Sequence, residues 1–83
     1  MIKLLFFARL REQLGSDEES LALPEAVTTV AELRHYVGAR DEVWQQVLFG
    51  PGIFVAVNQQ IAAWDTPLSG HEEVAFFPPV TGG

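Results

Sequence analysis

Hydrophobic and polar positions along this chain follow two repeats, one typical of β-strands and one typical of α-helices. The pattern predicts, in order, a strand at 2–7, a short helical turn at 8–15, a strand at 20–23, a helix at 29–39, a helical segment at 41–49, a strand at 53–58, a short strand at 60–64 and a strand at 74–77. Gly15 and Pro24 end two of these elements, because neither residue continues a helix or strand easily.

The main helix carries the clearest local signals. Thr29 followed by Glu32 three residues later forms a capping-box pattern, which predicts that the helix begins here. Val30, Leu33 and Val37 recur at the spacing of one helical face. We therefore expect this helix to bury a single apolar stripe.

The order of elements predicts the fold class. Hydrophobic strands lie at the two ends of the chain and the main helix lies between them, which favours an α+β domain with a mixed sheet covered on one face by that helix. No internal repeat or linker divides the chain. We expect one domain over residues 1–83 that ends in a flexible tail at 78–83.

Alternation along the end strands predicts which side chains point away from the core. If Ile2, Leu4 and Phe6 face the helix, Phe7 faces the opposite side. In the last strand the same rule leaves Phe77 outward, and Ile61 of the short strand joins them. Phe7, Ile61 and Phe77 are thus predicted to form an apolar partner interface beside the tail. A slip of one residue would instead place all three in the core.

Charge restricts the classes of partner. Eleven acidic residues against five Lys and Arg give a net charge of -6, so the protein repels nucleic acid and anionic membranes and favours a basic protein surface. The apolar N-terminal stretch carries Lys3 and Arg9 and is too short to span a bilayer, which predicts a cytoplasmic protein.

Candidate catalytic groups are scarce. The chain has no cysteine, so a thiol nucleophile and a cysteine-ligated metal are excluded. His35 and His71 stand alone, without a second ligand at metal spacing, and are interpreted as surface or capping residues. No Ser-His-Asp set or phosphate loop is present. The pattern predicts no metal site and no catalysis by this chain alone.

The last residues, FFPPVTGG, have an unusual composition for a chain end. Two prolines favour an extended segment, and residues 78–83 would reach roughly 20 Å from the sheet. Gly82 and Gly83 lack a Cβ, so the terminal backbone fits a narrow slot and its carboxylate is open to reaction. A carboxylate is a poor acyl donor, and activation by ATP to an acyl-adenylate would overcome this.

The quoted ending, together with IKLLFFARLRE at the start and VNQQ in the middle, resembles the molybdopterin synthase small subunit family over the whole chain. The resemblance implies a ubiquitin-like β-grasp fold and the role of a sulfur carrier. It implies that a partner enzyme adenylates Gly83 with ATP, that a sulfurtransferase system then forms a thiocarboxylate there, and that no cofactor is bound permanently.

The resemblance further implies that the tail enters a large synthase subunit and donates sulfur to cyclic pyranopterin monophosphate, in a heterotetramer with two copies of each subunit. Its tail-insertion residues are Pro78, Pro79, Val80, Thr81 and Gly82. Three alternatives remain open: a sulfur carrier of the thiamin pathway, a protein modifier joined to lysine through Gly83, and a ubiquitin-like interaction domain with an inert tail.

Overall fold

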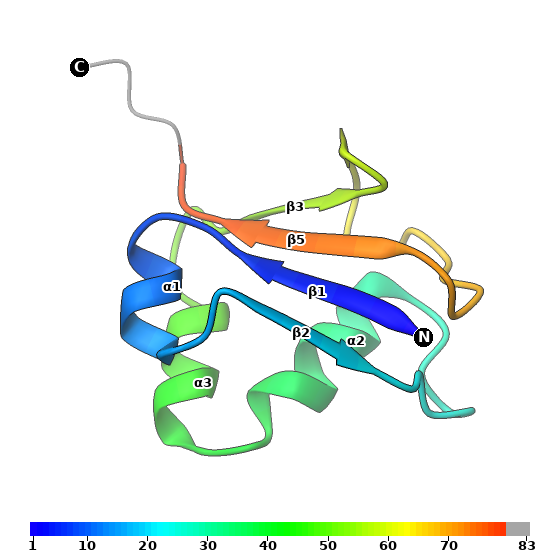
Figure 1. Ribbon diagram of the computed structural model, residues 1–83, viewed down its shortest axis with the longest axis horizontal. Helices are drawn as coiled ribbons and strands as arrows, with labels where there is room; N and C mark the ends of the chain where they lie inside the picture. The colour runs from blue at the N-terminus through cyan, green and yellow to red at the C-terminus, as the bar shows by residue number, and fades with distance from the viewer. Residues whose placement is uncertain (80–83) are drawn as a thin grey trace.

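The computed structural model describes residues 1–79. Its elements are β1 (Ile2–Phe6), α1 (Arg9–Leu14), β2 (Glu18–Leu21), α2 (Val30–Gly38), α3 (Glu42–Leu48), β3 (Phe54–Val57), β4 (Gln60–Ile61) and β5 (Glu73–Phe77) (Figure 1). Each predicted element is present within a few residues of its expected bounds. The predicted α+β class is confirmed.

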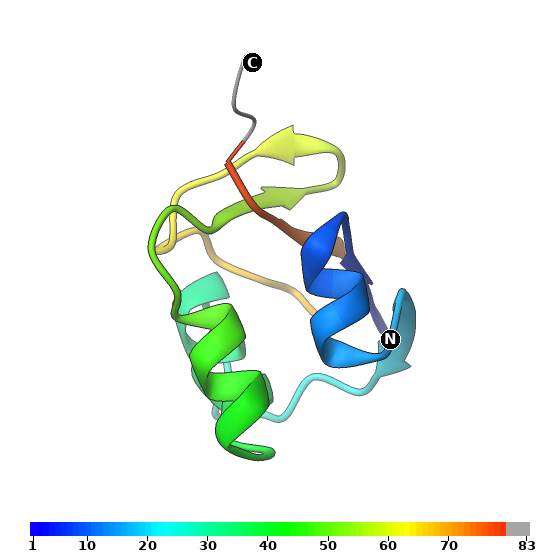
Figure 2. The ribbon, with the colours of Figure 1, turned by 90° about the vertical axis from the view of Figure 1, so that its left-hand side faces the viewer.

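The strands form one mixed sheet in the order β2-β1-β5-β3-β4. The two end strands of the chain, β1 and β5, are central neighbours and run parallel, with Phe6 opposite Phe76. The other pairs are antiparallel. Because β1 and β5 run in the same direction, the C-terminal ends of both strands lie at the same end of the sheet. The end of β5 is therefore close to the point where β1 leads into α1 (Figures 1 and 2).

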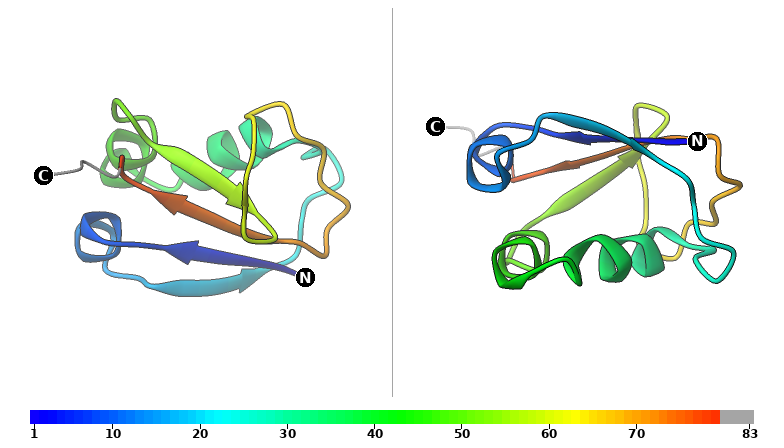
Figure 3. Two further views of the ribbon diagram at one scale, coloured as in Figure 1. Left: turned by 90° about the horizontal axis from the view of Figure 1, so that it is seen from above. Right: turned by 60° about the horizontal axis from the view of Figure 1, so that its bottom comes forward.

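Helices α2 and α3 lie against one face of the sheet, and among the described residues no helix covers the other (Figure 3). The buried core lies between these layers and consists of Ile2, Leu4, Phe6, Leu10, Val27, Val30, Leu33, Val37, Leu48, Ile53, Val55, Val74 and Phe76. The alternation predicted for β1 and β5 is therefore confirmed, because the expected inward residues are all in this core. We call the uncovered side of the sheet the open face.

The predicted start of the main helix is also confirmed. Thr29 is the N-cap, and its Oγ1 accepts a hydrogen bond from the Glu32 backbone N–H at 3.2 Å. The Glu32 carboxylate in turn accepts from the backbone N–H groups of Thr29 at 3.2 Å and Thr28 at 2.7 Å. These bonds satisfy donors that the first helical turn leaves free, so the helix begins at a defined residue.

The second strand was predicted two residues too late, at 20–23 instead of Glu18–Leu21. β2 is an edge strand that includes the acidic residues Glu18 and Glu19, and both carboxylates have partners. Glu18 lies 3.6 Å from the Lys3 ammonium on the open face. Glu19 accepts hydrogen bonds from Arg40, whose guanidinium holds the pKa of this carboxyl below its usual range. Pairing with β1, with a smaller contribution from these solvent-accessible ion pairs, thus holds the acidic residues in a strand despite their low strand propensity.

The hairpin between β3 and β4 depends on two residues with positive φ. Asn58 has φ 50° and Gln59 has φ 69°, as a two-residue hairpin turn of type I′ requires. The turn places Ile61 opposite Ala56, and both lie on the open face. The short strand was predicted over 60–64, but it spans Gln60–Ile61, followed by one further backbone hydrogen bond from the Ala62 N–H to the Val55 carbonyl at 3.0 Å.

The loop before β5 is organised around one carboxylate. Glu72 accepts hydrogen bonds from the backbone N–H groups of Ser69, Gly70 and His71 and from the Ser69 hydroxyl, at 2.8–3.1 Å. Burial raises the pKa of Glu72, but the bonds from Ser69 and Gly70 outweigh it and lower the pKa to about 2. The ionised form of Glu72 therefore holds this loop in place.

Candidate functional site: the open face and the root of the tail

The root of the tail lies at the end of β5. Phe77 is its last strand residue, and the half-buried Pro78 and Pro79 follow. Hydrogen bonding to β3 stops here because proline has no backbone N–H. Of the predicted tail residues, Val80, Thr81, Gly82 and Gly83 lie outside the described residues.

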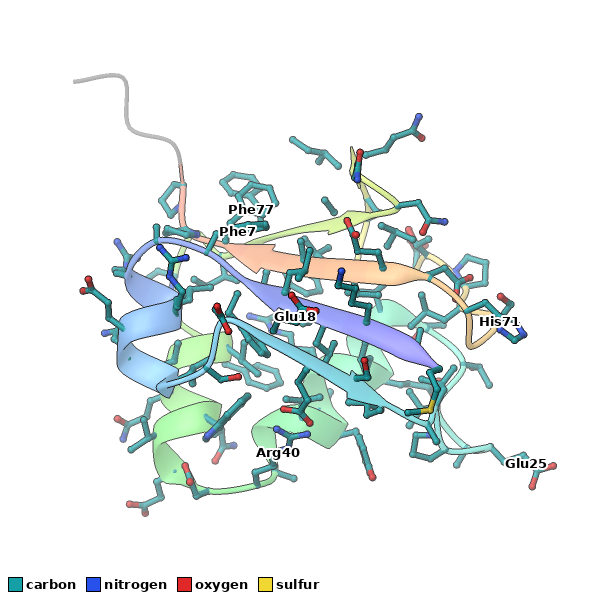
Figure 4. The ribbon with its side chains drawn as sticks, in the orientation of Figure 1. Phe7, Glu18, Glu25, Arg40, His71 and Phe77 are labelled. Atoms are coloured by element: carbon teal, nitrogen blue, oxygen red, sulfur yellow. The ribbon has the colours of Figure 1, made fainter. Side chains whose placement is uncertain are left out.

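Three aromatic side chains cross the open face next to this root. Phe54 is opposite Phe77 in the β3–β5 pairing, and their rings stack with centroids 5.8 Å apart. On the other side of β5, the Phe7 backbone N–H donates to the Phe76 carbonyl at 3.2 Å, which brings Phe7 beside Phe77 (Figure 4). Phe7 and Phe54 remain 45% and 43% exposed. An apolar row thus spans three strands.

An apolar groove of about 260 Å³ lies beside this row. Phe54, Ile61, Phe77 and Pro79 line it, and none of them carries a charge. Ile61 is 75% exposed, the highest exposed fraction among the large hydrophobic side chains of the described part of the chain. Together with Phe7, these four residues make up what we call the apolar patch. The patch is continuous with the tail because Pro79 belongs to both.

The opposite end of the open face is polar. Lys3 lies opposite Ser20 on β2 and Glu73 on β5, and its ammonium pairs with Glu18 at 3.6 Å. Lys3 and Glu18 thus form an ion pair at this end, while the end nearest the tail is apolar. The open face is therefore polar at the end far from the tail and apolar at the end next to it.

The structure places Phe7, Ile61 and Phe77 on the open face, as the alternation predicted. It brings Ile61 and Phe77 into one groove, and Phe7 lies on the other side of Phe77. Phe54 was missed, although the same alternation places it on one face with Ala56. The signal that was lacking is the pairing of β3 with β5, which brings Phe54 opposite Phe77.

The described residues group no metal ligands. His35 and His71 are exposed, and within residues 1–79 no three His, Cys, Asp or Glu side chains are grouped so as to hold a metal ion. None of the helices in this range is long and apolar enough to cross a membrane. An uncharged patch of this kind on a small protein indicates a protein-binding surface.

Comparisons with known proteins agree with this arrangement. Residues 4–83 match the profile of the ThiS family. The whole chain is 45% identical over 83 residues to the whole molybdopterin synthase sulfur carrier subunit of Escherichia coli (strain K12).

Solved structures show the same fold. A putative molybdopterin converting factor, subunit 1, from Pyrococcus furiosus is 35% identical and superposes with a TM-score of 0.78 over 95% of this chain and 97% of that one. SAMP1 from Haloferax volcanii is 26% identical, with a TM-score of 0.81 over 99% and 98% of the two chains. The chain therefore belongs to the ThiS family, has the ubiquitin-like β-grasp fold, and is a member of the molybdopterin synthase sulfur carrier subunits within it.

Proposed function

We propose that this protein carries sulfur as a thiocarboxylate on Gly83 and donates it to cyclic pyranopterin monophosphate. In the first step a carboxylate oxygen of Gly83 attacks the α-phosphate of ATP on an activating enzyme, and pyrophosphate leaves. The outer sulfur of a persulfide on a sulfurtransferase then attacks the acyl carbon and AMP leaves, and a thiol reduces the resulting acyl disulfide to the thiocarboxylate. The chain is a substrate in both steps, and its partners supply the catalytic groups.

The single observation that carries this proposal is the continuity of the apolar patch with the tail root. A tail delivers its end into another protein's active site only if the domain docks in a set orientation. Pro79 lines the groove with Phe54 and Ile61, so a partner seated on the patch contacts the first residues of the tail. The absence of cysteine is consistent with sulfur carried on the chain terminus.

We further propose that the large synthase subunit covers the apolar patch, in a heterotetramer with two copies of each subunit. Aromatic side chains such as Phe7, Phe54 and Phe77 are typical of the centre of protein interfaces. The net charge of -6 favours a basic surface around that centre. Pro78 to Gly82 form the segment that enters the partner, and Gly83 is the reacting residue.

Intact-mass spectrometry tests the carrier chemistry directly. The protein is incubated with ATP, a sulfur donor, the activating enzyme and the sulfurtransferase, and its mass is compared with that of a variant lacking Gly82 and Gly83. We expect a gain equal to one oxygen replaced by sulfur, located at Gly83, in the full-length chain alone. No gain, under conditions in which the same enzymes modify the Escherichia coli carrier, would refute the proposal.

A second candidate function is protein modification through an isopeptide bond between Gly83 and a lysine. The likeness to SAMP1, a small archaeal modifier protein, favours it, although the identity is 26% against 45% for the carrier subunit. Stable conjugates in extracts of cells that express the tagged protein, absent when Gly83 is deleted, would support this alternative. The lower identity makes it the weaker candidate.

A further inference from the structure

The segments that extend from β3 and β5 stay close together beyond the last strand pair. Phe54 is opposite Phe77, so the antiparallel register brings Gly52 opposite Pro79 two residues further along. The two residues are in close contact: a Cβ built on Gly52 would lie 3.2 Å from Cγ and 3.4 Å from Cδ of Pro79. The loop between α3 and β3 therefore runs beside the tail root (Figure 2).

Gly52 has two properties that this contact requires. Its φ of +76° follows Pro51, the combination of residues typical of a type II turn. It also has no side chain, so the proline ring can pack directly against its backbone. Since Pro79 cannot donate a backbone hydrogen bond, packing replaces hydrogen bonding as the restraint on the tail at this point.

We propose that Gly52 is a positioning residue for the reactions at Gly83, beginning with its adenylation, because the contact with Pro79 sets the direction in which the chain leaves the domain. Pro79 is held between Gly52 on one side and the apolar groove on the other. The patch and Pro79, the last described residue of the tail root, are thereby presented to a partner in one relative geometry. This inference rests on the proposed carrier function.

The contact between Gly52 and Pro79 increases the fraction of molecules whose tail is oriented to enter the partner's active site. When only a fraction of molecules is competent to bind, the apparent affinity falls by that fraction. Moving Pro79 away from Gly52 therefore raises the KM for the carrier. It leaves kcat unchanged, because the terminal residues that react are the same.

Gly52→Ala and Gly15→Ala form a matched pair for the test. Gly15 has a similar φ of +68°, but a Cβ built there meets no atom within 4 Å. Both variants bear the strain of a positive φ, and only Gly52→Ala also pushes against Pro79. If Gly52→Ala does not fold, Gly52→Asn replaces it with Gly15→Asn as the control, because asparagine tolerates this conformation.

Two measurements are made on the full chain. The first is steady-state pyrophosphate release by the activating enzyme at varied carrier concentration, with the sulfurtransferase and a sulfur donor in excess so that the enzyme turns over, well below the melting temperature of every variant. We expect Gly52→Ala to raise the KM by about three- to tenfold with kcat unchanged, and Gly15→Ala to leave KM within about twofold of the wild type. The second is the nuclear Overhauser effect between Gly52 Hα and the Pro79 ring protons, which we expect in the wild type and in Gly15→Ala.

The outcomes separate the two proposals. Gly52→Ala kinetics equal to those of Gly15→Ala would overturn the positioning role and leave the carrier function standing, as would a wild type without the Overhauser contact. A wild type that releases no pyrophosphate, when the enzyme acts on the Escherichia coli carrier, would overturn the carrier function and this inference with it.

Discussion

The carboxylate of Glu72 provides a quantitative test of how the loop before β5 is held. Replacing it by glutamine keeps its size but removes the charge and places an NH₂ group among backbone donors. The ionised carboxylate accepts hydrogen bonds from three backbone N–H groups and one hydroxyl, which glutamine cannot reproduce. We expect Glu72→Gln to destabilise the folded protein at neutral pH.

The magnitude follows from the pKa of Glu72, which folding lowers from 4.5 to about 2. A group with a lowered pKa contributes stability above its unfolded pKa, and this contribution is lost as the pH falls through the folded one. At about 1.36 kcal/mol per pH unit, the difference sets a ceiling of about 3.4 kcal/mol. Solvent reaches the carboxylate, so we discount this to about 1–2 kcal/mol.

Urea unfolding at pH 7 and near pH 2, followed by fluorescence of Trp44 and Trp64, measures this contribution. We expect Glu72→Gln to lose about 1–2 kcal/mol of unfolding free energy at pH 7 and most of that difference to vanish near pH 2. Glu25→Gln, at an exposed position that projects into solvent (Figure 4), is the control and should match the wild type. Equal stability of Glu72→Gln and wild type at pH 7 would refute the reasoning.

Three further substitutions test separate parts of the structure. Ile61→Asp should leave the unfolding free energy within about 0.5 kcal/mol but weaken calorimetric binding to the large synthase subunit about tenfold or more; unchanged binding would remove Ile61 from the interface. Ala8→Gly should raise the unfolding free energy by about 1 kcal/mol, because Ala8 has φ 54° and ψ -133°, a conformation that favours glycine; a lower melting temperature would contradict this. Arg34→Lys should lower the unfolding free energy by about 1 kcal/mol. The reason is that the Arg34 guanidinium carbon lies 4.2 Å from the Phe49 ring centroid and 4.1 Å from the Trp64 ring centroid. Urea unfolding unchanged from the wild type would show that lysine makes equivalent contacts with these rings.

Much of the candidate site was predictable because it depends on local rules. Alternation along a strand places Phe7 and Phe77 on the face opposite Ile2 and Leu4, whatever the neighbouring strands are. The order of elements also predicts a mixed sheet, because the two end strands are hydrophobic and the main helix lies between them. The positions of Glu18 and Glu19 in β2 were less predictable, because their partners Lys3 and Arg40 are distant in sequence.

The sequence by itself determined the periodicity, the helix cap at Thr29 and the charge, because these depend on residues within a few positions of one another or on composition alone. Tertiary structure decided which strands are neighbours. Only that pairing stacks Phe54 on Phe77, completes the apolar groove with Pro79, and brings Gly52 against the tail root. The physical reason is that contacts between segments distant in sequence depend on the order of the strands in the sheet, which no local pattern encodes.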